Sequence, residues 1–150
     1  VIIFLSSCSS MNVTEENVYS DDVKTVKASS SMPENINLDS MAIFANATVY
    51  FEFDKASLKS KSIQTLKSAV DALNENSSIK VTLSGHADER GTREYNLALG
   101  QRRAESVSDY LVLNGINKSR ITVKSFGEEK PLAFGQDEAS YAKNRRVEIN

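Results

Sequence analysis

The chain has 150 residues, of which 18 are basic and 20 are acidic, so its formal net charge at pH 7 is −2. This length suits one domain with an appended segment, and the balanced charge excludes a broad basic surface for nucleic acid. The single cysteine, Cys8, excludes an internal disulfide.

The first residues read VIIFLSSCSS, an apolar run followed by two serines and Cys8. Five apolar residues are too few to cross a hydrocarbon core of about 30 Å. LSSC resembles the lipobox of bacterial lipoproteins, in which the cysteine becomes the lipidated first residue. We therefore expect residues 1–7 to be the remnant of a signal peptide and Cys8 to carry lipid. The alternative is a frayed apolar terminus with an incidental cysteine.

Residues 9–46 are rich in Ser, Asn, Asp, Glu and Lys and lack a sustained period of 2 or 3.6 residues. This composition predicts a flexible polar tether, so that the tether with the lipidated Cys8 occupies residues 8–46. The apolar cluster at residues 41–44 is expected to dock on the domain as a short turn.

The folded domain is predicted to occupy residues 47–150. TVYFEF, at residues 48–53, alternates apolar and polar side chains, which indicates a half-buried strand. Residues 57–75 place apolar side chains three and four apart, the pattern of an amphipathic helix. IKVTLS, at residues 79–84, alternates again and predicts the second strand.

A helix from about Arg93 to Asn114 follows, with Thr92 as its cap and Gly115 as its stop. ITVKSF, at residues 121–126, predicts a third strand; a short helix and the strand RVEIN end the chain. The order β-α-β-α-β-α-β predicts an α+β fold of two layers, with helices on one face of a mixed four-stranded sheet.

The polar stretch SGHADERGTREYN, at residues 84–96, holds His86, the only histidine, and invites a catalytic interpretation. No nucleophile elbow, Walker loop or metal-ligand cluster accompanies it. We therefore expect no enzyme, no metal and no cofactor, and a structural role for His86 in which its ring bonds the loop backbone. The alternative is an envelope hydrolase that uses His86.

Helix geometry separates the two arginines of the sequence GQRRAES. At 100° per residue, Ala104, Val107 and Leu111 form a buried stripe, which Gly100 and Leu97 extend. Arg102 then faces water. Arg103 lies on the flank of that stripe.

On this flank Arg103 is in line with Asn96 and near Leu99, where these side chains can line a groove beside the loop of Asp88. A carboxylate facing a guanidinium suits a zwitterionic ligand. The alternatives are a turn-forming role for Asp88 and an interhelical salt bridge for Arg103.

Five stretches in this order resemble the OmpA-like domain family in its lipoprotein branch: YFEFDKASL, SGHADERGTREYN, LALGQRRAESVSDYL, SFGEEKP and YAKNRRVEI. The resemblance covers about residues 48–150. It implies a module that binds peptidoglycan non-covalently through the diaminopimelate of the stem peptide. It also implies that this binding tethers the outer membrane to the cell wall.

In this sequence Asp88 matches the acidic residue and Arg103 the basic residue of the family's ligand-binding motifs. Phe53, Asp54 and Asn96 match three further positions of the family's site. Leu99, next to them on the helix, completes the predicted site.

The same resemblance implies a lipid-anchored protein of the outer membrane that faces the periplasm. It implies as partner the periplasmic propeller protein of the Tol system (TolB), and with it a part in envelope integrity and cell division. Other Tol or OmpA-like proteins are further partners to consider, and no nucleic acid is expected. The alternative is a scaffold lipoprotein that acts mainly through its Tol partners.

Overall fold

The computed structural model describes residues 38–45 and 47–150, so the expected signal remnant, Cys8 and most of the expected tether lie outside the described residues. The elements follow in this order: α1 (Leu38–Ala45), β1 (Thr48–Tyr50), α2 (Ser60–Glu75), β2 (Val81–His86), α3 (Arg93–Leu113), the 3₁₀ turn η1 (Lys118–Arg120), β3 (Ile121–Gly127), α4 (Glu138–Asn144) and β4 (Arg146–Ile149).

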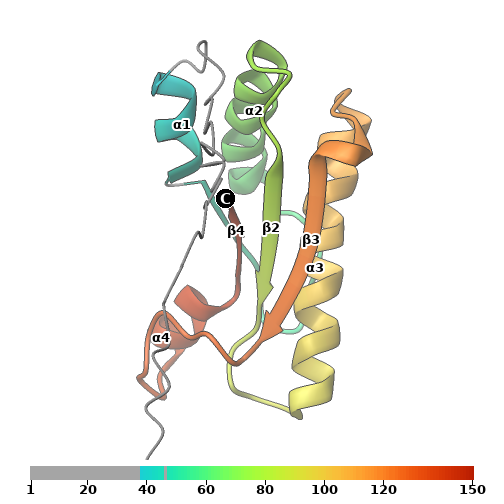
Figure 1. Cartoon of the computed structure of the whole chain (residues 1–150). Coiled ribbons are helices and arrows are strands. Elements are labelled where there is room, and N and C mark those ends of the chain that lie inside the picture. The colour runs from blue at the N-terminus through green and yellow to red at the C-terminus, as the bar shows by residue number, and fades with distance from the viewer. Residues whose placement is uncertain (1–37, 46) are drawn as a thin grey trace, which may run out of the picture. The chain divides into compact units, whose positions relative to one another are not determined.

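The four strands form one mixed sheet in the order β1-β4-β2-β3. β2 and β3 run parallel, whereas β4 runs antiparallel to both β1 and β2. Helices α2 and α3 lie behind the sheet in the view of Figure 1, on one and the same face. The α+β class, the mixed four-stranded sheet and the helices on one face are thus confirmed.

The core lies between this face and the two helices. The predicted stripe of α3 is confirmed, since Ala104, Val107 and Leu111 are all fully buried. They meet inward-facing strand residues, among them Leu83 and Val147, in one apolar cluster. Leu97 was wrongly placed on the stripe: it is 49% exposed, although its backbone carbonyl accepts a hydrogen bond from Ser125 of β3.

Two local predictions differ from the structure. The first strand ends at Tyr50 and not at residue 53, because the chain turns there: Asp54 has a φ of 56°, and the amide of Lys55 donates to the carbonyl of Glu52. The cluster at residues 41–44 is not a turn but part of α1, and its Phe44 is buried in the core.

Helix α3 and strand β2 approach closely at two glycines. A Cβ atom built on Gly85 would lie 1.9 Å from the carbonyl oxygen of Gly100, so neither residue has room for a side chain. This contact brings Leu99 and Arg103, one residue before and three after Gly100, to the carboxyl end of β2. Loops at the end of a rigid strand are where binding residues commonly lie.

Among the described residues, no helix is both long enough and apolar enough to cross a membrane.

Candidate functional site

A pocket of about 210 Å³ lies where β2 ends and α3 begins. All six residues predicted as ligand-binding line it, together with three that were not predicted. The predicted ones are Phe53, Asp54, Asp88, Asn96, Leu99 and Arg103; the others are Arg90, Gly91 and Tyr95. The prediction that the loop after β2 and the start of α3 form one groove is therefore supported by the geometry.

Asp88 is the buried carboxylate of this pocket, with only 4% of its surface exposed. Its Oδ1 accepts hydrogen bonds from the backbone amide of Arg90 (3.1 Å) and from Arg90 Nε (3.0 Å). Its Oδ2 accepts from Arg90 Nη2 at 2.7 Å and from Arg145 Nη1 at 3.3 Å. Burial raises the pKa of Asp88, but these hydrogen bonds outweigh it and the net shift is downward. Asp88 is therefore an anion at neutral pH.

The bond from the Arg90 amide also makes Asp88 a turn-former for its own loop, as the alternative interpretation expected. The amide occupies one acceptor position of the carboxylate, and the side chains of Arg90 and Arg145 occupy the others.

Arg103 is a fully buried cation that ties three segments together. Its Nε donates to the carbonyl of Lys55 (2.8 Å), its Nη1 to that of His86 (2.8 Å) and its Nη2 to that of Glu52 (3.0 Å). Burial lowers the pKa of Arg103 to about 10, which leaves it charged at neutral pH. Three of its five N–H groups thus donate to backbone carbonyls. Within residues 38–45 and 47–150, Arg103 does not form the interhelical salt bridge that the alternative interpretation expected.

The neighbouring Arg102 is exposed, as helix geometry predicted. Its guanidinium lies 5.6 Å from the ring centre of Tyr95. Helix periodicity thus distinguished two adjacent arginines correctly.

The rim of the pocket is fixed by side-chain bonds between elements. Tyr95 Oη donates to Asp54 Oδ1, and the side-chain amide of Asn96 donates to Glu128. The predicted cap, Thr92, accepts from the amide of Tyr95 at 3.2 Å and so sets the start of α3. The Tyr95 bond ties the first turn of α3 to the loop after β1, and the Asn96 bond ties it to the loop after β3.

Arg90 and Arg145 are the charged residues that sequence reasoning missed. The guanidinium of Arg90 lies between two rings, 4.1 Å from the centre of Phe53 and 4.3 Å from that of Tyr141. Arg145 is buried and also donates to the carbonyl of Phe51 (3.1 Å) and to Glu138 (2.6 Å). The signal for Arg90 was its position two residues after Asp88. Arg145 lies in the stretch YAKNRRVEI, but neither periodicity nor spacing pointed from it to Asp88.

His86 does not line the pocket. It is 2% exposed, its ring stacks on Phe126 at 5.4 Å, and neither ring nitrogen has a hydrogen-bond partner in the part of the chain described. The expectation that the ring bonds the loop backbone is therefore wrong; it is the backbone carbonyl of His86 that is bonded, and it accepts from the side chain of Arg103 on α3. Burial, then the charge of Arg146, lowers the pKa of His86 to about 4.

Within residues 38–45 and 47–150, no group of three or more His, Cys, Asp or Glu is placed to hold a metal ion. The chemistry of the pocket is instead that of fixed charges and apolar walls: two carboxylates, two guanidinium groups, and the sides of Phe53 and Leu99. Such a site can bind a small group that carries both charges.

Comparison with known proteins agrees with this architecture. The model of the OmpA family matches residues 50–145. The peptidoglycan-associated lipoprotein of Pseudomonas aeruginosa is 48% identical over 111 residues, which cover 74% of this chain and 66% of that protein. That of Pasteurella multocida is 48% identical over 100 residues, covering 67% of each chain. The match therefore spans about two thirds of the length of these two relatives, and 56% of that of the relative from Agrobacterium fabrum.

Solved structures give the same result. The peptidoglycan-associated lipoprotein from Burkholderia pseudomallei is 42% identical with a TM-score of 0.69, covering 71% of this chain and 91% of that one. The cell wall anchor of the T6SS from Pseudomonas aeruginosa is 31% identical with a TM-score of 0.58, covering 68% and 76%. The chain belongs to the OmpA family and, within it, to the peptidoglycan-associated lipoproteins.

Proposed function

We propose that the pocket binds peptidoglycan non-covalently, by holding the zwitterionic end of diaminopimelate in the stem peptide. The observation that carries the proposal is the buried, ionised Asp88 in a small pocket that also contains guanidinium groups. An anionic carboxylate binds an ammonium, and a guanidinium binds a carboxylate through two parallel hydrogen bonds. Phe53 and Leu99 supply apolar walls for the methylene chain between these charges and the rest of the peptide.

The lipoprotein relatives support a place in the cell envelope for the whole protein. In this proposal Cys8 carries the lipid and the tether ends before α1, because Phe44 of that helix belongs to the core. The folded domain that includes α1 binds the wall, so that the outer membrane is linked to peptidoglycan from its periplasmic side. A partnership with the Tol system, chiefly its propeller protein, belongs to the same proposal. Pull-down of the purified propeller protein by the full chain tests that partnership.

Binding is tested by titration of the full chain with a muropeptide that contains diaminopimelate, and by co-sedimentation with purified sacculi. Asp88→Asn removes the charge that the ammonium requires, and we expect a loss of binding of about 2–5 kcal/mol, at least about thirtyfold. Asp109→Asn is the matched control, because Asp109 is an exposed carboxylate on α3 that does not line the pocket. Binding by Asp88→Asn equal to that of the control would contradict the assigned site.

A further inference from the structure

Both carboxylate oxygens of Asp88 are already occupied by cations of the protein itself. Arg90 contacts both, through Nε on Oδ1 and Nη2 on Oδ2, and Arg145 adds a longer bond to Oδ2. A ligand ammonium that binds Asp88 must therefore replace one of these two partners, since the side chain is only 4% exposed and each of its oxygens already accepts two hydrogen bonds.

Arg90 is the partner that can be replaced. Its side chain is 34% exposed, whereas that of Arg145 is 5% exposed and fixed by Phe51 and Glu138. Apart from Asp88, Arg90 is held mainly by its stacking between the rings of Phe53 and Tyr141. Stacking holds the plane of a guanidinium without directional hydrogen bonds, so Arg90 can slide between the rings and stay at the pocket.

An Arg90 that leaves Asp88 needs another anion. Apart from Asp88, the nearest anion among the described residues is Glu138, whose Oε2 is 3.5 Å from Arg90 Nη1. Glu138 already pairs with Arg145 at 2.6 Å, however. A ligand that brings only an ammonium would leave the guanidinium poorly paired. A ligand that brings an ammonium and a carboxylate supplies the missing anion.

Arg103 is less suited to take that carboxylate first. Its side chain is fully buried and three N–H groups are committed to the carbonyls of Glu52, Lys55 and His86. Arg90 lines the same pocket, is partly exposed and holds its fork toward a carboxylate already. A ligand carboxylate can therefore reach the guanidinium of Arg90 more easily than that of Arg103.

We infer that Arg90 selects the ligand by an exchange of ion pairs: the ligand ammonium takes the place of Arg90 on Asp88, and the guanidinium then pairs with the ligand carboxylate. This inference rests on the proposed function and deepens it, because it names Arg90, in the loop after β2, as the residue that binds the ligand carboxylate. The internal Asp88–Arg90 pair excludes simple amines, which displace Arg90 without giving it a new partner.

The test is titration of the full chain with two muropeptides, one containing diaminopimelate and one containing lysine, which lacks the second carboxylate. We expect the wild type to prefer the diaminopimelate form by about tenfold or more. In Arg90→Gln this preference falls by about tenfold, and the lysine form binds about threefold more tightly than to the wild type, since its ammonium no longer competes with a guanidinium.

Arg93→Gln is the matched control: it removes one exposed arginine three residues away that pairs with Glu129 and does not line the pocket. It should keep the wild-type preference. Arg90→Lys keeps the charge but loses the fork, and should give an intermediate preference. Thermal unfolding shows whether each variant is folded.

The outcomes separate the two proposals. Binding of the diaminopimelate form by the wild type, with an unchanged preference in Arg90→Gln, overturns the exchange and leaves the proposed function intact. Absence of binding in both proteins overturns the proposed function and the exchange with it. A preference that collapses in Arg90→Gln, is intermediate in Arg90→Lys and is kept in Arg93→Gln supports both.

Discussion

The side chain of Arg103 donates to the backbone carbonyl of His86 over 2.8 Å, and no part of that side chain is exposed. The same guanidinium holds the carbonyls of Glu52 and Lys55. It therefore joins the end of β2, the turn after β1 and the middle of α3. The arginine is a structural centre of the pocket as well as part of its lining.

Arg103→Met is expected to lower the free energy of unfolding by about 3 kcal/mol or more, because three carbonyls lose their charged donor in a buried place. Urea unfolding measures this. Arg102→Met is the control and should change stability by no more than about 0.5 kcal/mol, since Arg102 is exposed. Equal effects of the two substitutions would contradict the structural role of Arg103.

Gly85→Ala should destabilise the fold by about 3 kcal/mol, because the new methyl group would meet the backbone of Gly100 at 1.9 Å and force α3 away from β2. Gly115→Ala is the matched comparison: it has a φ of 93° but nothing within 4 Å of the new atom, so it should cost only about 1 kcal/mol of backbone strain. Thermal or urea unfolding of both variants tests the contrast. A Gly85 variant as stable as the Gly115 variant would refute the close contact.

His86 predicts a specific pH dependence of stability. Its pKa is about 4 in the folded protein and about 6.5 in an unfolded chain, so the unfolded state binds more protons between these values. Stability therefore falls as pH drops from about 6.5 to 4, by about 3 kcal/mol in total from this residue. Arg146 and Lys130 lower the pKa of His86 further and Glu148 raises it, but burial is the largest cause of the shift.

The measurement is urea unfolding of the wild type and of His86→Phe at pH 7 and pH 5. We expect the wild type to lose more stability than the variant, by about 2 kcal/mol. The comparison stops at pH 5 because Asp88, whose pKa is lowered, contributes its own loss at more acidic pH. Parallel pH profiles for the two proteins would count against a neutral, buried His86.

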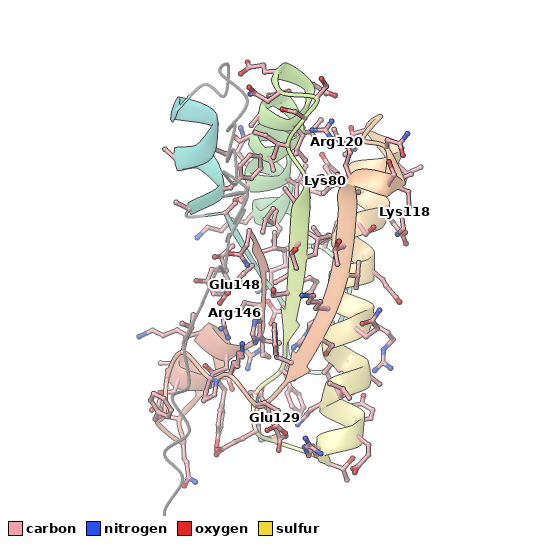
Figure 2. All side chains as sticks on the ribbon, viewed as in Figure 1. Lys80, Lys118, Arg120, Glu129, Arg146 and Glu148 are labelled. Carbon is pink, nitrogen blue, oxygen red and sulfur yellow. The ribbon has the colours of Figure 1, made fainter. Side chains whose placement is uncertain are left out.

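Arg120 stabilises the end of the domain that lies opposite the pocket. It donates to the carbonyls of Leu73, Asn76 and Ile79, each at 2.8 Å, and so caps the end of α2 and the loop after it (Figure 2). Arg120→Met should cost about 2 kcal/mol in urea unfolding. Lys80→Met, an exposed neighbour in the same view, should cost less than about 0.5 kcal/mol. Unchanged binding by Arg120→Met would show that the effect is confined to stability.

The sequence predicted the elements and part of the pocket because local rules apply to both. Apolar periodicity gives the buried stripe of Ala104, Val107 and Leu111, and the same angle of 100° per residue puts Arg103 beside it and Arg102 in water. The capping rule gives Thr92. Each of these inferences uses residues within a few positions of one another.

The features of the fold and pocket that the sequence did not predict depend on contacts between residues far apart in the chain. Arg145 meets Asp88 across 57 positions, and no spacing or composition indicates that pair. The first strand ends early because the chain turns at Glu52, whose carbonyl accepts from the amide of Lys55 and from the side chain of Arg103. Tertiary structure here overrides the alternation of apolar residues, which predicted a longer strand.

The place of β4 in the sheet governs when this fold can form. The last strand lies between β1 and β2, and pairs with both (Figure 1). Until residues 146–149 have been synthesised, β1 has no partner and β2 lacks one of its two neighbours. Pairing of strands so far apart in sequence is slow. A growing chain consequently cannot complete this sheet before residues 146–149 are available, even though β2 and β3 can already pair.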